Sequence, residues 1–437
     1  MNPYVDHKSK RISKTNKSGS KADDLKIQRN LVAQEPLNMN HNRHDKSFPP
    51  NLLQASRRSQ PAPIPATTWN RNPSQTTMSR NLAPLPPIGY AQQRVDGTRR
   101  RCEDLVLQMI REFGLAMGQT LSEPVTTKFS SKHENSFVKV GSSCMQGWRI
   151  NMEDAHSHLL SLPGDKEACF FGVFDGHGGV KVAQYAGNNL HKKIVSQSSY
   201  SKGNISEALR NGFLALDEEM LKDEAMKDEL AGTTAVVVLI KNGKMYCGNV
   251  GDSRAVASVH GEVEQLSFDH KPSNESETRR IIAAGGWVEF NRVNGNLALS
   301  RALGDFVFKK NDKKRAEEQI VTANPDVIEK PITPDHEFIV LACDGIWDVL
   351  TNQEVVEFVR NRIAQRMEPD TICEELMTRC LAPDCQAGGL GCDNMTVVLV
   401  CFLHGGTYDD LVRKCARPSR AGPAPHLRDY SAGFEFK

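Results

Sequence analysis

The amino-acid sequence predicts an α+β fold in which two antiparallel β-sheets are sandwiched between layers of α-helices. From Phe137 onward, short and strongly apolar runs recur, as is typical of buried strands. Several runs are separated by only a few residues, which indicates antiparallel hairpins. Longer segments with the apolar spacing of amphipathic helices lie between them. Strand meanders interrupted by long helices favour sheets with the helices packed outside.

The individual elements are predicted in chain order. The expected strands are ACFFGVFD (168–175), TTAVVVLI (233–240), MYCGNV (245–250), RAVASVH (254–260), EFIVLACD (337–344) and NMTVVLVCF (394–402). The second and third strands are close enough in sequence for a hairpin with its turn within residues 241–243. The helical patterns cover residues 180–196, 206–222, 273–284, 353–366 and 370–380.

The chain divides into three parts. Residues 1–116 are rich in Asn, Ser, Pro, Arg and Gln, with too few apolar residues to offset chain entropy. We predict a disordered N-terminal tail there, with a short helix at 101–116. A folded domain is expected over residues 117–403, and a short C-terminal tail over residues 404–437.

The composition indicates an intracellular protein. No run approaches the roughly 18 apolar residues of a transmembrane helix, and residues 1–21 lack the apolar centre of a signal peptide. The 11 cysteines contain no Cys-x-x-Cys pair, and an odd number cannot close entirely into intramolecular bridges. We therefore expect a soluble, monomeric protein of the cytoplasm or nucleus, with reduced thiols.

The distribution of charge argues against a nucleic-acid partner. Residues 1–116 carry 19 Lys and Arg against 9 Asp and Glu, whereas the remainder carries 36 against 44. The tail is therefore basic and the body acidic. Affinity for phosphate backbones comes mainly from clustered Lys and Arg, so an acidic body is a poor nucleic-acid binder.

Acidic residues recur at the ends of the predicted strands, in short turns. The turns are Met152-Glu153-Asp154, Asp175-Gly176-His177-Gly178-Gly179, Gly251-Asp252-Ser253, Asp344-Gly345 and Asp393-Asn394. A carboxylate at the end of a buried strand is fixed by the sheet, and glycine lets the backbone approach a ligand closely. Each Asp-Gly alone is more often an ordinary turn, but the joint pattern indicates a site.

Carboxylates that converge in one cleft repel one another unless cations neutralise them. A shell of carboxylates, carbonyls and water suits Mg²⁺ or Mn²⁺, whereas zinc prefers Cys and His, which do not dominate these turns. The pattern therefore predicts Mg²⁺ or Mn²⁺.

Eight longer motifs contain these turns. In chain order they are GWRINMEDAH (147–156), VFDGHGG (173–179), GTTA (232–235), NVGDSR (249–254), DHKP (269–272), LSRALGD (299–305), ACDGIWD (342–348) and CDNMT (392–396). In content and order they closely resemble the metal-dependent type 2C serine/threonine protein phosphatases, over about residues 117–403. The resemblance implies a pair of antiparallel sheets between helices, with two metal ions in a cleft at one edge.

The resemblance also implies ligands for the two ions. Asp175 would bridge both ions. Asp344 and Asp393 would complete one site, while Glu153 and the carbonyl of Gly176 would serve the other. A third, weaker ion would be bound by Asp252, Asp344 and Asp348.

The implied reaction is hydrolysis of phosphoserine and phosphothreonine in protein substrates by a metal-activated water, without a covalent intermediate. Arg149 would bind phosphate oxygens through its planar fork of donors, or serve as a surface ion-pair residue. His177 would protonate the leaving oxygen, or orient Asp175. Asp154 would position a metal-bound water. Arg301, in a presumed flap beside the cleft, would help receive substrate or form a structural salt bridge.

Three other functions are alternatives to a metal-dependent protein phosphatase. The segment from Cys373 to Arg379 satisfies the C-x5-R pattern of cysteine phosphatases, but its helical pattern and adjacent Glu374 and Glu375 argue against a phosphate-binding loop. A catalytically inactive scaffold is disfavoured by the intact acidic positions. A hydrolase of small phosphoesters would differ only in its substrate.

Residues 117–122 (MGQTLS) fit the pattern of N-myristoylation, although they are internal in this chain. Membrane attachment is therefore expected only for a hypothetical shorter form that starts at Met117. The alternative is that Met117-Gly118 is a hinge.

Overall fold

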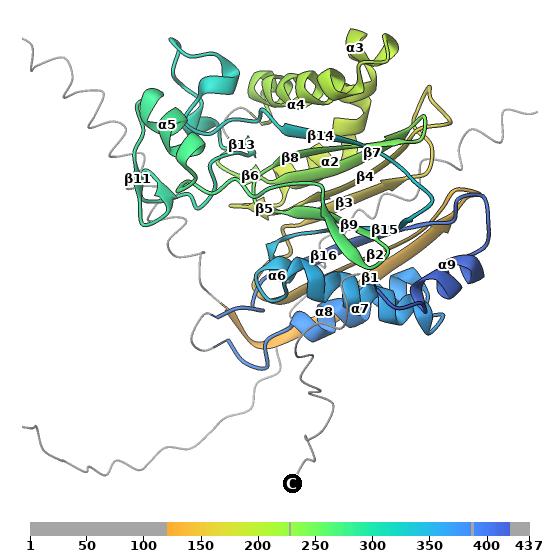
Figure 1. Cartoon of the computed structure of the whole chain (residues 1–437). Coiled ribbons are helices and arrows are strands. Elements are labelled where there is room, and N and C mark those ends of the chain that lie inside the picture. The colour runs from red at the N-terminus through yellow and green to blue at the C-terminus, as the bar shows by residue number, and fades with distance from the viewer. Residues whose placement is uncertain (1–119, 227–228, 386–388, 420–437) are drawn as a thin grey trace, which may run out of the picture. The chain divides into compact units, whose positions relative to one another are not determined.

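The computed structural model describes residues 120–226, 229–385 and 389–419. The predicted tail at 1–116, its short helix and the MGQ segment at 117–119 lie outside these residues. Within the described part, two antiparallel sheets are covered by helices, so the predicted α+β class is confirmed (Figure 1). No helix among the described residues is long and apolar enough to span a membrane.

The larger sheet has six strands. Their spatial order is β1 (Thr120–Glu134), β2 (Val138–Arg149), β16 (Met395–Phe402), β15 (His336–Ala342), β9 (Arg254–Val259) and β10 (Glu262–Gln265). Every neighbouring pair is antiparallel. The start of β16 therefore lies beside the end of β15, where Val397 faces Ala342.

The second sheet has five strands, again all antiparallel. Their order is β14 (Asp326–Pro331), β8 (Lys244–Val250), β7 (Ala235–Lys241), β4 (Cys169–Phe174) and β3 (Ala155–Leu159). The predicted hairpin joins β7 to β8 through Asn242 and Gly243, whose φ angles are 51° and 68°. Two consecutive left-handed residues give a turn whose twist matches that of the strands, which explains the Asn-Gly pair.

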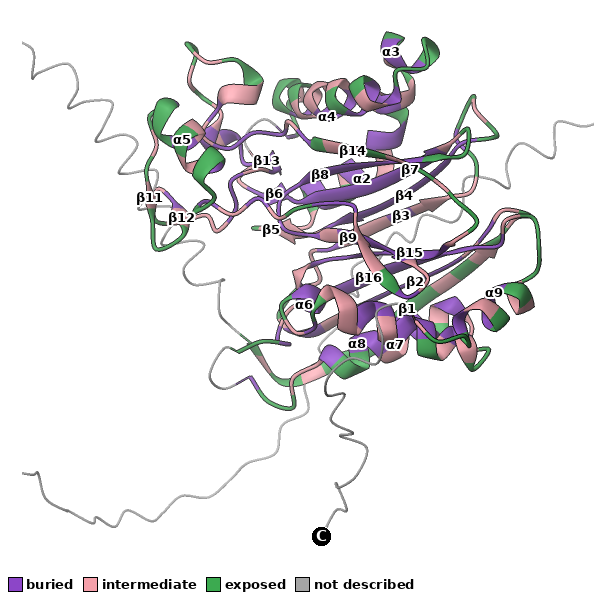
Figure 2. Ribbon diagram, viewed as in Figure 1, coloured by how far each residue is buried: buried purple, intermediate pink, exposed green. Residues whose placement is uncertain are grey.

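Helices cover the outer face of each sheet. Helices α2 (Lys181–Val195) and α4 (Ile205–Lys222) pack on the five-stranded sheet around Phe174 and Phe213. Helices α7 (Asn352–Ala364), α8 (Pro369–Cys380) and α9 (Tyr408–Cys415) pack on the six-stranded sheet. A third apolar cluster, which includes Phe171 and Ile339, fills the space between the sheets. The strand interiors are accordingly buried (Figure 2).

A smaller region adjoins one end of the sandwich. It contains α5 (Glu275–Ala283) and the hairpin of β11 (Val288–Glu289) with β12 (Arg292–Val293), together with short helices η1 (Phe306–Phe308) and η2 (Ala316–Glu318). A three-stranded sheet of β13 (Leu303–Gly304), β6 (Gly232–Thr233) and β5 (Gly176–His177) links this region to the turn that follows β4. The remaining helices are α3 (Ser198–Ser201) and α6 (Asp344–Trp347).

The structure extends and corrects the expectations from sequence. All six predicted strands and all five predicted helices are present, with ends shifted by one or two residues. Helix α9 lies beyond the predicted domain end at residue 403 and packs on the core through Leu411 and Cys415. The expectation that all thiols are reduced is wrong for one pair, because a disulfide joins Cys385 to Cys392.

Strand β2 and helix α8 pack so closely that only glycine fits at residue 141. A Cβ atom there would overlap the backbone of Pro369 and Asp370, which cannot move without displacing α8. We expect Gly141→Ala to lower the free energy of unfolding by about 3 kcal/mol, the upper range for overpacked cores, as measured by urea unfolding. Gly389→Ala is the control, because its Cβ would meet no atom within 4 Å. Equal losses in the two variants would contradict this account.

Candidate metal centre

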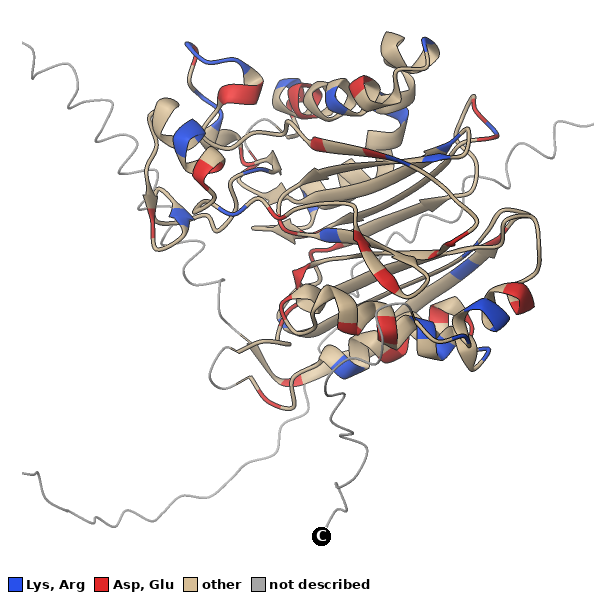
Figure 3. Ribbon diagram, viewed as in Figure 1, with Lys and Arg blue, Asp and Glu red and all other residues tan. Residues whose placement is uncertain are grey.

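The acidic turns predicted from the sequence meet at one end of the sandwich. Asp175 follows β4, Asp252 follows β8 and Asp344 follows β15, while Asp393 precedes β16. The antiparallel registers place these strand ends together, since Phe174 faces Ala155 and Ala235 faces Val250. Figure 3 shows acidic positions gathered along this edge, where the two sheets approach each other.

The turn after β4 brings two of the expected ligands side by side. A Cβ on Gly176 would overlap the carbonyl oxygen of Glu153, so the two backbones are in contact only because residue 176 is glycine. Asp175 is held by Thr234, whose backbone N–H donates to the Asp175 carbonyl at 2.9 Å. The Thr234 hydroxyl accepts a hydrogen bond from the Asp175 N–H at 3.2 Å. The structure therefore fixes this turn before any ligand binds.

Asn394 connects the β16 end of the site to the loop between β2 and β3. Its side-chain oxygen accepts from the Glu153 N–H at 2.9 Å. Its amide nitrogen donates to the carbonyls of Gln146 at 2.8 Å and Asn151 at 2.9 Å. Asn394 lies in the CDNMT motif, but no function was predicted for it. The structure shows that it positions the Glu153 loop against Asp393.

Asp154 is buried with one oxygen unpaired. Its Oδ2 accepts a hydrogen bond from the Thr396 hydroxyl at 2.7 Å, but Oδ1 has no partner in the structure. Burial, together with the charge of Asp393, raises the pKa of Asp154 to about 7 despite the hydrogen bond from Thr396. An orphaned carboxylate oxygen in an acidic cleft is the feature that a bound cation would satisfy.

The pKa values of the neighbouring carboxyls of Asp175 and Asp344 are also raised. Burial raises the pKa of Asp175 well above its usual value, and the charges of Asp344, Asp154, Asp393 and Asp252 raise it further. Burial and the charges of Asp252, Asp393 and Asp348 do the same to Asp344. Mg²⁺ and Mn²⁺ prefer carboxylate and other oxygen ligands, so the residues present fit the ions predicted from sequence.

Two features of the cleft were not predicted. Lys271 forms an ion pair with Asp252 and also faces Asp344 and Asp348, so a resident cation lies among the three residues expected to bind a third ion. Cys343 lies beside Asp154 and Asp175, with one candidate ligand atom of each within 4.8 Å of the others. Burial raises the pKa of the Cys343 thiol, and sulfur is a softer ligand than Mg²⁺ or Mn²⁺ prefers.

Arg149 and His177 both lie at the cleft, paired with carboxylates. The Arg149 guanidinium forms an ion pair with Asp393, and 42% of its side chain remains exposed. His177 Nε2 lies 2.8 Å from Oδ2 of Asp305, which is almost fully buried. Burial lowers the pKa of His177, but the charge and hydrogen bond of Asp305 outweigh it, so the pKa is raised. Asp305 was not predicted, and its charge and hydrogen bond favour the protonated form of His177.

Arg301 occupies a structural position. Its Nε and Nη2 donate to Glu277, and Nη1 donates to Asp326 at 2.7 Å and to the Asn324 carbonyl at 3.1 Å. Only 13% of its side chain is exposed. Of the two interpretations of Arg301, the geometry favours the structural salt bridge over direct contact with substrate.

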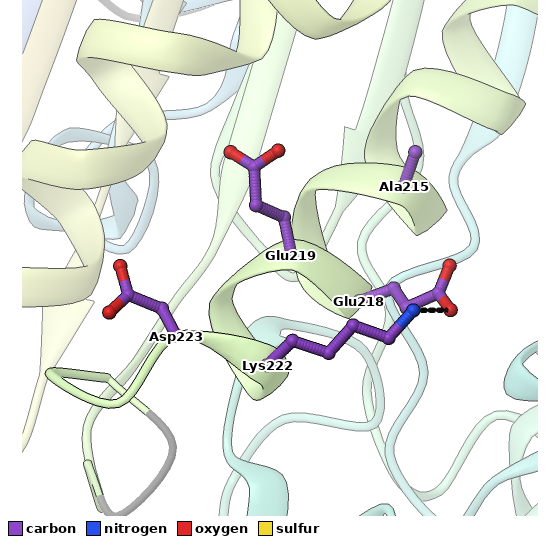
Figure 4. A pocket seen from close by; sticks show the side chains of 5 residues that line it. All are labelled: Ala215, Glu218, Glu219, Lys222 and Asp223. Atoms are coloured by element: carbon purple, nitrogen blue, oxygen red, sulfur yellow. Dashed lines mark hydrogen bonds and ion pairs between the residues drawn. The ribbon is translucent and has the colours of Figure 1, made fainter.

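Neither Cys373 nor a surface hollow on α4 forms a second candidate phosphatase site. Cys373 is buried within α8, and burial raises the pKa of its thiol, which removes the physical basis of the cysteine-phosphatase alternative. A shallow hollow of about 410 Å³ lies on α4, lined by Ala215, Glu218, Glu219, Lys222 and Asp223 (Figure 4). In this hollow Glu218 is already paired with Lys222, and none of its lining residues belongs to the acidic cleft.

The raised carboxyl pKa values predict how stability depends on pH. A carboxyl whose pKa is higher in the folded than in the unfolded state makes folding less favourable once it ionises. Because the pKa of Asp154 rises from 3.8 to about 7 on folding, the melting temperature in EDTA should fall as the pH rises from about 4 to about 7. Saturating Mg²⁺ should remove most of this fall. A flat profile in EDTA would contradict the electrostatic account.

The fold and the acidic cleft define a class of phosphatase, and solved structures show the likeness directly. A serine-threonine phosphatase 2C from Toxoplasma gondii is 22% identical, with a TM-score of 0.54 over 63% of this chain and 99% of its own. A second Toxoplasma gondii phosphatase is 27% identical, with a TM-score of 0.55 over 64% and 96% of the two chains.

Sequence comparisons identify the family. Residues 138–388 match the model of the protein phosphatase 2C family. A probable protein phosphatase 2C of Caenorhabditis elegans is 71% identical over 303 residues, which cover 69% of this chain and 85% of the relative. The protein phosphatase 2C homolog 2 of Schizosaccharomyces pombe is 50% identical over 71% of this chain and 85% of its own length. The chain belongs to the protein phosphatase 2C family of serine/threonine phosphatases.

Proposed function

We propose that the chain hydrolyses phosphoserine and phosphothreonine in phosphoproteins at a centre for two Mg²⁺ or Mn²⁺ ions, with no covalent enzyme intermediate. The observation that carries the proposal is the convergence of buried carboxyls with raised pKa values around an unpaired Asp154 oxygen. Asp175, Asp344, Asp393, Glu153 and the carbonyl of Gly176 would hold the ions. Such ions supply Lewis acidity and a nucleophilic water at neutral pH.

The protein's own residues have distinct roles in this proposal. Arg149 presents a planar fork of donors that binds phosphate oxygens once it exchanges Asp393 for substrate. His177, whose protonated form is favoured by Asp305, donates its proton to the leaving serine or threonine oxygen. Asp154 accepts a hydrogen bond from the attacking water, while Thr396 fixes its other oxygen. We further propose that the enzyme acts as a monomer in the cytoplasm or nucleus.

The test is phosphate release by the full chain from a phosphothreonine peptide, with Mn²⁺, with Mg²⁺ and with EDTA. We expect hydrolysis with either ion and none with EDTA. If the protein is folded and metal-loaded but inactive, the catalytically inactive scaffold is favoured. If it hydrolyses only small phosphoesters and not the peptide, the small-phosphoester hydrolase is favoured. Addition of methanol should give no methyl phosphate, because transfer to an alcohol acceptor would require a phosphoenzyme.

A further inference from the structure

The disulfide between Cys385 and Cys392 lies next to the candidate metal centre. It spans the segment between α8 and β16, and its Cα atoms are 6.0 Å apart. Cys392 immediately precedes Asp393 in the chain. We propose that Cys385 and Cys392 form a reversible thiol-oxidation site that controls how firmly Asp393 is held for metal binding. The proposal rests on the proposed role of Asp393 as a metal ligand.

The disulfide packs against Trp148, next to Arg149 in the chain. Both of its cysteines are buried against Trp148, which directly precedes Arg149. The indole N–H of Trp148 donates to the Ala382 carbonyl at 3.0 Å, on the other side of the disulfide. Arg149 therefore follows Trp148, which contacts the disulfide, and Asp393 follows Cys392, which forms it. These two neighbours, Arg149 and Asp393, form an ion pair with each other.

Because Cys392 and Asp393 are consecutive residues, a displacement of Cys392 also moves the backbone of Asp393. A Cβ on Gly147 would lie 2.8 Å from the Asp393 carbonyl oxygen, so β2 and this segment are in close contact. The Ala382 N–H donates to the Gly391 carbonyl at 2.9 Å. Neither contact involves a cysteine sulfur, so reduction should remove the covalent restraint next to Asp393 and leave the fold intact.

The chemistry is thiol–disulfide exchange with a small disulfide such as oxidised glutathione. The two cysteine thiols lose two protons and two electrons as the bond between their sulfurs forms, and oxidised glutathione is reduced to two glutathione thiols. A dithiol reductant reverses the step. In a reducing compartment a persistent disulfide is rare, and one that forms transiently is typical of a redox sensor.

The other thiols of the described residues are unsuited to this role. All eight are buried, and none is joined to another cysteine. Burial raises the pKa of Cys373 and of Cys415, which suppresses the reactive thiolate. Cys385 and Cys392 are buried as well, so it is their position within bonding distance of each other that should make oxidation to a disulfide select them.

The experiment compares the full chain after reduction with dithiothreitol and after oxidation with oxidised glutathione. Peptide mass spectrometry should find the Cys385–Cys392 link in the oxidised sample alone. Mn²⁺ affinity, measured by calorimetry, should be higher in the oxidised protein by about tenfold, the lower range for supports of metal ligands. Cys392→Ser should bind like the reduced protein in both conditions, whereas Cys380→Ser, a buried cysteine near the end of α8, should keep the full response.

Two results would overturn the proposal: no link after oxidation, or a link with equal Mn²⁺ affinity in both states. The comparison of the two states of the unmodified protein needs no variant to fold. Failure of the proposed function would be seen separately, as redox-dependent Mn²⁺ binding without release of phosphate from the phosphothreonine peptide.

Discussion

Replacing Asp175 by Asn should abolish phosphate release and stabilise the metal-free protein. Asp175 is half-buried, and its desolvation together with the charges of four other carboxyls raises its pKa well above the usual value. Asparagine keeps the shape and removes the charge, so repulsion in the ion-free cleft decreases. In the proposed centre Asp175 would serve both ions, so its replacement should lower kcat by about a thousandfold, roughly three steps of 1.36 kcal/mol.

Three measurements decide this prediction. Phosphate release with Mn²⁺ should be lost, the melting temperature in EDTA should rise, and the stabilisation by Mn²⁺ should shrink. Asp312→Asn is the matched control, because Asp312 is exposed in the loop before η2. Metal-dependent activity that survives Asp175→Asn would remove Asp175 from the proposed centre.

Glu277→Ala should destabilise the fold by about 3–5 kcal/mol, the range for a buried ion pair that loses one partner. Glu277 is only 2% exposed and accepts hydrogen bonds from Arg301 and Arg280, at 2.8 Å and 2.6 Å at the closest, and from Ser300 at 2.7 Å. Burial raises its pKa, but Arg301 and Arg280 outweigh burial and lower the pKa to about 2. Removal of Glu277 leaves two guanidinium groups buried without their main counter-charge.

Glu275 offers a control on the same helix. It is exposed and pairs with Arg279 four residues later, and such pairs contribute about 0–1 kcal/mol. Urea unfolding should separate the two variants clearly. Similar, small losses for Glu277→Ala and Glu275→Ala would show that the network around Arg301 does not hold the α5 region in place.

The sequence was most informative where structure is local. The apolar runs predicted the buried strands because both faces of each sheet are covered, by helices on one side and by the other sheet on the other. Strand β1 was missed because most of its residues are exposed and polar, so it lacks an apolar pattern. Helix α9 was missed because it is only eight residues long and follows the last apolar run directly.

The residues of the candidate site also fall into two groups, those predicted from sequence and those found only in the structure. Its carboxylates were found from sequence because each lies in a recognisable turn at a strand end. The supports were not found, because Asp305, Thr396 and Asn394 act on residues 128, 242 and 241 positions away. The role of Arg301 stayed open for the same reason, since its ion pairs join Glu277 of α5 to Asp326 of β14.

By itself, the sequence determined the fold class, the family and the set of acidic positions, because side-chain periodicity and turn motifs are properties of neighbouring residues. Only the tertiary structure decided which groups are paired. It left an oxygen of Asp154 unpaired, placed Lys271 against Asp252 and packed the disulfide against Trp148. The physical reason is that burial and the antiparallel registers of distant strands fix which polar groups meet and which lose contact with water.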